Sequence, residues 1–123
     1  MPTQSKAGII RAVFAAYLSN DRKTVEDTFT DDFRFTSPYD DEIDKATYFE
    51  RCWRVTDWIQ RHELERIFVE GEEAFVTYKC LAKDGKSFRN TELFSFEGGK
   101  IKRIDVYFGA TYKDGIFVRQ SEG

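Results

Sequence analysis

The sequence lacks the features that define several large classes of protein. It has one histidine and two cysteines, and the cysteines show neither metal-binding nor redox spacing, so we expect Cys52 and Cys80 to be reduced and buried. Lysine and arginine form no run or stripe, and the formal net charge is -3. This argues against binding to nucleic acid or to an anionic membrane. No apolar run approaches the roughly 20 residues of a membrane span, and the start has no signal-peptide layout. We therefore expect a cytoplasmic protein.

Motifs for phosphate, metal and covalent chemistry are also missing. The chain has no glycine-rich phosphate loop, no HExxH pattern and no nucleophile elbow around a serine. A single histidine with scattered carboxylates makes a weak set of metal ligands. We therefore expect no metal site and no other cofactor.

Aromatic residues, in contrast, are abundant. They make up 16% of the chain, and 12 residues are phenylalanine. Such a number of large rings exceeds what a thin two-layer core needs, so the rings can fill a core or line a cavity. The 123 residues suit a single domain spanning 1–123, with a core at about 7–112 and a C-terminal tail at 113–123.

Apolar residues at helical spacing predict three helices. The expected ranges are 6–19, about 21–28 and 45–56. Ser5, the segment Ser19-Asn20-Asp21 and Asp44 are the expected N-caps, because short polar side chains can accept hydrogen bonds from the first free backbone N–H groups.

Alternation with period two predicts strands, and most of them follow the third helix. The expected strands are 33–37, 59–69, 74–82, 87–96 and 100–109. Asp84-Gly85 and Gly98-Gly99 are hairpin signals, so the last four strands form an antiparallel meander. Residues 39–42 are expected to form an exposed acidic loop, and 116–118 to add an edge strand or to cover one. The fold class is α+β: three helices packed on a strongly curved antiparallel sheet, cone-shaped, with a central pocket.

Asn90 and Glu92 are unusual because alternation places them on the inner face of the strand at 87–96. They lie between Phe88 and Phe94 on that face. A buried carboxylate without a partner is costly, so Glu92 is expected to be paired with a cation, to be protonated, or to line a cavity. If the inner face ends early, Glu92 is instead exposed to water.

Four segments, together with the order of the predicted elements, resemble a known family. They are Tyr17-Leu18-Ser19-Asn20-Asp21, Phe29-Thr30-Asp31-Asp32-Phe33, Phe35-Thr36-Ser37-Pro38 and the run GKIKRIDVYFG. Over roughly 7–112 the chain is similar to the nuclear transport factor 2-like superfamily (cystatin-like cones), and most of all to its SnoaL-like proteins, relatives of ketosteroid isomerases and limonene epoxide hydrolases. The resemblance implies the fold more than the function, because the superfamily hosts isomerases, hydrolases, cyclases and non-enzymes.

The resemblance also implies roles for particular positions. Ketosteroid isomerases hold a general-base aspartate just before the proline that ends the first strand, and here that position is Ser37. Their oxyanion-stabilising acid corresponds to Glu92, whereas the water-activating aspartate of limonene epoxide hydrolases corresponds to Val106. Serine is not a useful base near neutral pH, so the isomerase mechanism does not transfer whole. Valine cannot activate water, so the hydrolase mechanism does not transfer either. SnoaL-type cyclases use an aspartate and a histidine, and His62 is the one histidine here.

Three functional hypotheses follow. The first is a cofactor-independent acid–base isomerase, cyclase or hydrolase that acts on a small apolar substrate, with Glu92 and His62 as catalytic residues. His62 faces the pocket and pairs with Glu92, or it lies at the surface or rim. The second is a non-catalytic module that binds a ligand or a protein partner. The third is a vestigial pocket in a fold that serves mainly as a dimer. Side chains expected to contact the ligand, or else to fill the core, are Tyr17, Phe35, Ser37, Trp53, Tyr78, Asn90, Phe94, Val106 and Phe108.

The outer face of the predicted sheet carries apolar side chains among charged ones. They are Phe75, Leu81, Leu93 and Tyr107. A face of this kind favours a homodimer, which the resemblance also implies.

Overall fold

The structure of the chain is a computed structural model that describes residues 5–53 and 57–119. Within these residues the chain forms three helices and a seven-stranded sheet. The helices are α1 (Lys6–Leu18), α2 (Arg22–Thr28) and α3 (Lys45–Cys52). The strands are β1 (Phe29–Ser37), β2 (Asp40–Asp44), β3 (Ile59–Glu70), β4 (Glu73–Ala82), β5 (Lys86–Glu97), β6 (Lys100–Lys113) and β7 (Ile116–Val118).

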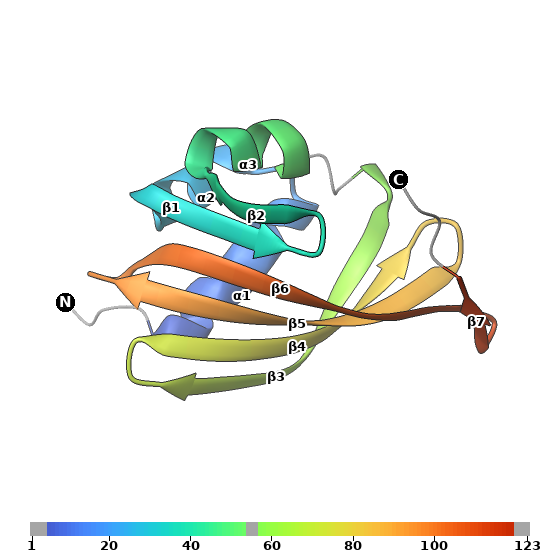
Figure 1. Cartoon of the computed structure of the whole chain (residues 1–123). Helices are drawn as coiled ribbons and strands as arrows, with labels where there is room; N and C mark the ends of the chain where they lie inside the picture. Colours follow the sequence, from blue (N-terminus) through green and yellow to red (C-terminus); the bar gives the residue numbers. More distant parts are fainter. Residues whose placement is uncertain (1–4, 54–56, 120–123) are drawn as a thin grey trace.

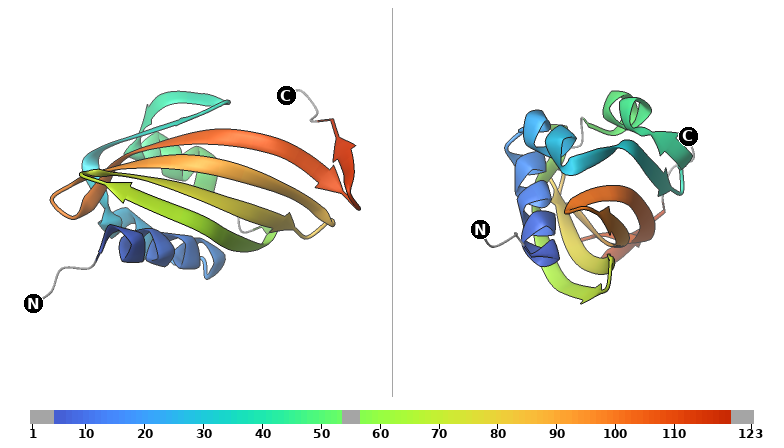
Figure 2. Two further views of the ribbon diagram at one scale, coloured as in Figure 1. Left: turned by 90° about the horizontal axis from the view of Figure 1, so that it is seen from below. Right: turned by 90° about the vertical axis from the view of Figure 1, so that its left-hand side faces the viewer.

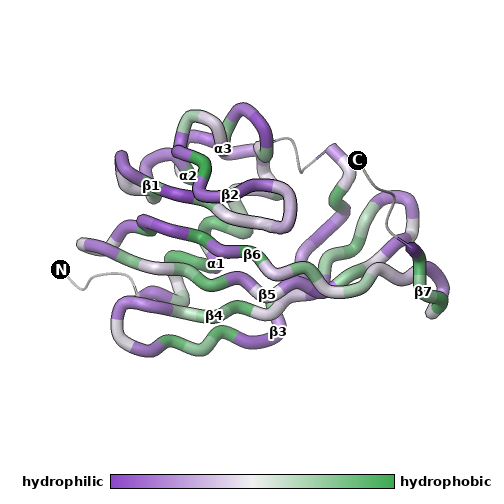
Figure 3. The backbone as a smooth tube through the Cα atoms, in the orientation of Figure 1, coloured by the Kyte–Doolittle hydropathy of each residue, from purple (hydrophilic) through white to green (hydrophobic). Residues whose placement is uncertain are grey.

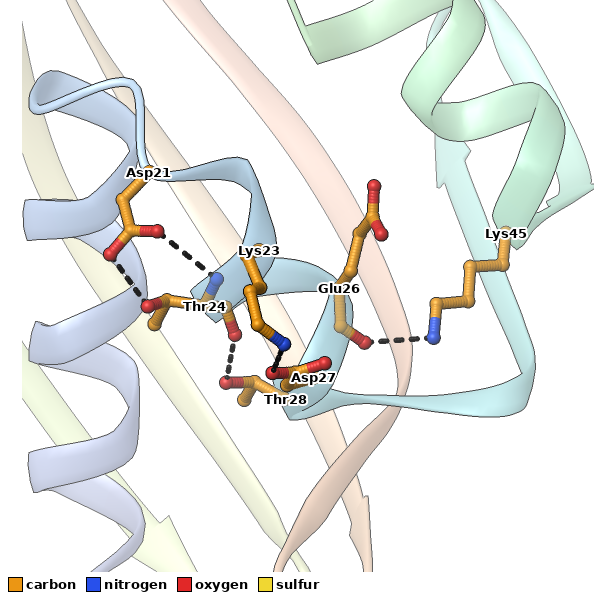
Figure 4. Close-up of polar contacts among 7 residues, drawn as sticks. All are labelled: Asp21, Lys23, Thr24, Glu26, Asp27, Thr28 and Lys45. Atoms are coloured by element: carbon orange, nitrogen blue, oxygen red, sulfur yellow. Dashed lines mark hydrogen bonds and ion pairs between the residues drawn. The ribbon is translucent and has the colours of Figure 1, made fainter.

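Each helix begins at a capping side chain, as the sequence predicted. Ser5, Asp21 and Asp44 each accept a hydrogen bond from the backbone N–H three residues further on, at 3.0, 3.2 and 2.9 Å. Lys45 then links two helices, because its Nζ donates to the carbonyl oxygen of Glu26 at 2.8 Å (Figure 4). This contact joins the start of α3 to the last turn of α2. The third helix ends at Cys52, and the expected end at Thr56 lies outside the described residues.

The seven strands form one mixed sheet in the order β2-β1-β6-β5-β4-β3, with β7 paired to β6 (Figure 1). The four long strands form the predicted antiparallel meander, and 116–118 form an edge strand. The prediction of a wholly antiparallel sheet is wrong at one place, because β1 runs parallel to β6. No hairpin connects these two strands, so the alternation of the meander does not set the direction of β1.

The segment expected to be an exposed loop, 39–42, includes the first three residues of the short strand β2. It pairs antiparallel with β1, with Phe35 opposite Ile43 and Ser37 opposite Asp40. The sequence of β2 is Asp-Asp-Glu-Ile-Asp, which has low strand propensity. The pairing with β1 satisfies its backbone groups and overrides that propensity.

The inner face of the sheet carries the core, as alternation predicted. Hydrophobic and hydrophilic residues alternate along the long strands (Figure 3), and the inward set on β4 is buried: Ala74, Val76, Tyr78, Cys80 and Ala82. Figure 2 shows the sheet curving, with α1 lying beneath it. Phe14 of α1 packs edge-on against Tyr78, with ring centroids 4.8 Å apart. No helix in the described part of the chain is long and apolar enough to cross a membrane.

Gly109 marks an irregularity where β5 and β6 pair. The register shifts between Phe88 and Asn90, and a Cβ at Gly109 would lie 2.2 Å from the carbonyl oxygen of Arg89. Only glycine allows the two backbones to approach so closely. The shift lets the backbone N–H of Gly109 donate to Asn90 Oδ1 at 3.4 Å.

Candidate functional site

A cavity of about 780 Å³ lies between the inner face of the sheet, α1 and α3. Most of its lining is aromatic or aliphatic, including Phe14, Phe35, Ile59 and Ile104. Its exposed rim includes Tyr39, Trp58 and Phe108, whose side chains are 59%, 49% and 40% exposed. A concave apolar space with a few polar groups is typical of small-molecule sites.

Nine of the eleven side chains singled out from the sequence line this cavity. They are Tyr17, Phe35, Ser37, His62, Tyr78, Asn90, Glu92, Val106 and Phe108. Trp53 and Phe94 do not, and they are buried in the core instead. Trp53 is tied to the turn between α1 and α2, because its indole N–H donates to Asn20 Oδ1 at 3.0 Å. Phe94 packs beside Phe14, whose ring is 6.4 Å away.

Glu92 occupies an apolar wall of the cavity and has one strong partner. Tyr78 Oη donates to its Oε2 at 2.5 Å, and no lysine or arginine among the described residues pairs with it. Burial disfavours the charged form and raises the pKa of Glu92 to about 7, although the Tyr78 hydrogen bond acts in the opposite direction. The protonated and the ionised forms of the side chain are therefore both populated near neutral pH.

Asn90 holds Tyr78 in place, and Gly109 in turn holds Asn90. Asn90 lies opposite Tyr78 in the sheet, and its Nδ2 donates to Tyr78 Oη at 3.1 Å. Asn90 itself accepts from the backbone of Gly109. The result is a chain of hydrogen bonds that runs from the backbone through Asn90 and Tyr78 to Glu92, and it fixes the direction of the carboxyl group.

His62 lines the cavity, although the sequence left its face undecided. Its ring packs edge-on against Phe14 and Tyr78, with centroids 5.2 and 5.5 Å away. Its Nδ1 is buried and has no hydrogen-bond partner. Burial lowers the pKa of His62 to about 4, so the imidazole is neutral at physiological pH.

The pair of His62 and Glu92 proposed from the sequence does not form a direct hydrogen bond in the described structure. Tyr78 contacts both, since its ring meets His62 and its hydroxyl meets Glu92. The pKa of Glu92 lies above that of His62, so a single proton in the cavity resides on the carboxyl group. This is the reverse of the order found for the two side chains in water.

Two tyrosines form a second polar group in the cavity, and only Tyr17 was anticipated. The hydroxyls of Tyr17 and Tyr48 share a hydrogen bond, and both residues line the cavity. Burial raises the pKa of each well above its usual value, and the nearby Glu92 adds to this effect. Both hydroxyls therefore remain protonated. Tyr48 is a buried residue of α3, and nothing in the sequence marked its pairing with Tyr17.

A third polar group lies where β1, β2 and α3 meet. Arg51 pairs with Asp40 Oδ1 at 2.7 Å, and the Asp40 side chain is only 8% exposed. Ser37 and Cys52 contact Asp40 Oδ2 at 3.5 and 3.9 Å. All four line the cavity. Sequence reasoning missed Asp40 and Arg51 because the segment around Asp40 was taken as an exposed loop.

The polar groups of the cavity do not form a set of metal ligands. Across 5–53 and 57–119, no three histidine, cysteine or carboxylate side chains gather as metal ligands. Burial raises the pKa of Cys52 to about 11 and that of Cys80 to about 12. Both thiols are therefore protonated, and they are poor nucleophiles.

Comparison with solved structures shows which proteins share this fold. An NTF2-like protein of unknown function from Cytophaga hutchinsonii has a TM-score of 0.74 at 19% identity, over 88% of this chain and 94% of that one. A candidate polyketide cyclase from Sinorhizobium meliloti has a TM-score of 0.66 at 22% identity, over 80% and 93%. A candidate ketosteroid isomerase from Kribbella flavida has a TM-score of 0.71 at 16% identity, over 85% and 78%.

Comparison of the sequence alone gives fewer matches than comparison of the structure. A search of curated proteins finds no match. Residues 10–104 match the profile of the SnoaL-like domain, which covers most of the chain but leaves out the first residues of α1, most of β6 and all of β7. The chain therefore belongs to the SnoaL-like family, with an NTF2-like fold.

Proposed function

We propose that this protein binds a small, largely apolar molecule in the cavity and transfers protons to and from it with Glu92. The observation that carries the proposal is the environment of Glu92. A carboxyl group on an apolar wall, oriented by Tyr78 and with a pKa of about 7, can donate and accept a proton at the same pH. Such matching of pKa to working pH is what general acid–base catalysis needs.

The reaction class that fits best is proton transfer next to a carbonyl group. Ionised Glu92 takes the proton from the carbon next to the carbonyl group, and the electrons of the broken C–H bond leave an enolate. Protonated Glu92 then returns a proton to a carbon of the enolate, which re-forms the carbonyl group and the carboxylate. Neutral His62, whose Nδ1 lacks a partner, contributes a hydrogen-bonding group rather than a cation. The surrounding rings make the environment of the carboxyl group less polar than water, which strengthens these polar contacts. Isomerisation and cyclisation both proceed through steps of this kind.

A simple exchange experiment tests the proposal without knowledge of the natural substrate. Small cyclic ketones are incubated with the protein in deuterium oxide, and the gain of deuterium beside the carbonyl is followed by NMR. We expect exchange with wild type, and about a hundredfold slower exchange with Glu92→Gln, since one acid–base group contributes about 10²–10⁴-fold. Glu97→Gln is the matched control, because Glu97 is an exposed residue of the same strand.

The alternative is a binding protein without catalysis. It is favoured by Ser37 and Val106, which stand where the resemblance expects a base and a water-activating aspartate. This alternative predicts that ketones bind with an affinity that survives Glu92→Gln, and that wild type exchanges no deuterium. Absence of exchange across the whole set of ketones contradicts the catalytic proposal.

Two wider predictions from the sequence carry over as proposals. We propose a homodimer that forms through the outer sheet face, where Phe75 and Tyr107 are 47% and 57% exposed. We also propose a cytoplasmic location, which tagging and microscopy or cell fractionation can test.

A further inference from the structure

Asp40 presents a second carboxylate to the same cavity as Glu92. It lies on β2, at the far side of the cavity wall from β5. Its side chain is 8% exposed, and Arg51 holds its Oδ1 at 2.7 Å. Arg51 itself is half exposed and also lines the cavity, so both members of the pair border the cavity.

The other oxygen of Asp40 has unused capacity to accept hydrogen bonds. Its contacts to Ser37 Oγ and Cys52 Sγ measure 3.5 and 3.9 Å, which are long for a charged acceptor. A carboxylate oxygen has about two lone-pair sites. Asp40 Oδ2 can therefore receive a shorter, stronger hydrogen bond from a donor inside the cavity.

On the sheet side of the cavity, the interval between the two carboxyl groups is mainly apolar. Strands β1 and β6 separate β2 from β5, so three strand spacings, or about 14 Å along the curved sheet, lie between them. Phe35, Ile104 and Val106 line this interval. The hydroxyls of Tyr17 and Tyr48 face the cavity from the helices. The sheet side thus has a carboxyl group at each end and mainly apolar side chains between them.

We propose that Asp40 Oδ2 binds a hydroxyl group at one end of the ligand while a carbonyl group at the other end reaches Glu92. The ligand class is then a rigid, mostly apolar hydroxy-ketone whose two polar groups lie at opposite ends. This inference rests on the proposed function, because it takes Glu92 as the site of the carbonyl group. It adds an anchoring residue that lies three residues beyond Ser37.

Matched pairs of ligands test this assignment. The probes are hydroxy-ketones of two to four fused rings, beginning with 6-hydroxy-1-tetralone, each compared with its methyl ether by calorimetry. The ether cannot donate a hydrogen bond. We expect at least one free hydroxyl compound to bind wild type about tenfold to a hundredfold more tightly than its ether, as a hydrogen bond to a charged group allows.

The variants locate the effect. Asp40→Asn should reduce the preference for the hydroxyl compound to a few-fold. Asp41→Asn, the same change at the exposed neighbouring residue, should leave it intact. The wild-type ratio requires no variant, so the test stands even if Asp40→Asn fails to fold.

Three results overturn the inference. The first is equal binding of every hydroxyl compound and its ether, and the second is an equal preference in Asp40→Asn and Asp41→Asn. After either of these results, the proposed function still stands if ketones bind wild type and bind Glu92→Gln more weakly. The third is tighter binding when a carboxylate replaces the hydroxyl group, which makes Arg51 the anchor. If no ketone binds wild type at all, the proposed function and this inference fail together.

Discussion

Glu92 and His62 are expected to act on stability in opposite directions as the pH changes. Glu92 has a folded-state pKa of about 7 against an ordinary value of 4.5, so its folded form keeps a proton that the unfolded form has lost. Stability therefore falls as pH rises from 4.5 to 7. His62 has a folded-state pKa of about 4 against 6.5, so the unfolded form binds the extra proton. Its contribution falls as pH drops from 6.5 to 4. Between pH 4.5 and pH 6.5 the two contributions to the free energy of unfolding change in opposite directions and nearly cancel.

Replacing Glu92 removes one of these two pH-dependent contributions to the free energy of unfolding. In Glu92→Gln only His62 still makes the free energy of unfolding depend on pH. The free energy of unfolding of the variant minus that of wild type should therefore rise as pH increases from 4.5 to 7. The change approaches about 3 kcal/mol, from 2.5 pKa units at about 1.4 kcal/mol each. Urea unfolding at several pH values measures it. A difference that does not vary with pH means that Glu92 is not perturbed.

Replacing His62 should change the pH dependence of stability in the opposite sense. In His62→Leu only Glu92 still makes the free energy of unfolding depend on pH. The variant should therefore become more stable relative to wild type as pH falls from 6.5 to 4. Leucine fills the space beside Phe14 and Tyr78 without a nitrogen that lacks a partner. The same urea series provides the measurement. A relative loss of stability at low pH contradicts a buried, neutral His62.

At the scale of elements, the sequence predicted what depends on local pattern and missed what depends on pairing across the chain. The three N-caps and the meander follow from local residue chemistry, and the structure has them. The direction of β1 and the existence of β2 depend on contacts between distant or charge-rich segments, and no periodicity encodes them. For the same reason Glu92 could be found by alternation, whereas Asp40 could not.

The irregular pairing of β5 and β6 gives a prediction about an element. Gly109→Ala places a Cβ against the carbonyl oxygen of Arg89, so the strands must separate, and we expect a loss of about 2 kcal/mol or more. Gly71→Ala is the control, because its φ is +59° but nothing lies within 4 Å of the added Cβ. Strain alone should cost about 1 kcal/mol there. Urea midpoints compare the two, and an equal loss argues against the close approach.

At the scale of the whole molecule, the outer sheet face is the proposed dimer interface. Phe75 lies directly opposite Leu93, and with Leu81 and Tyr107 they bring apolar side chains to the outer face. We expect Phe75→Glu to convert a dimer to a monomer in size-exclusion chromatography with light scattering, because a charge buried in an interface is costly. Ile116→Glu, at an exposed position on β7 outside this set, should leave the dimer intact. A monomeric wild type contradicts the proposal.

The central claim is that the fold places a carboxyl group which titrates near neutral pH inside the cavity. Carbon-13 labelling of glutamate side chains, with Glu92→Gln to assign the signal, allows the Glu92 carboxyl to be titrated directly by NMR. We predict a midpoint near pH 7, where burial outweighs the hydrogen bond from Tyr78. A midpoint near the ordinary value of 4.5 would show a solvated carboxylate and contradict the proposed proton transfer.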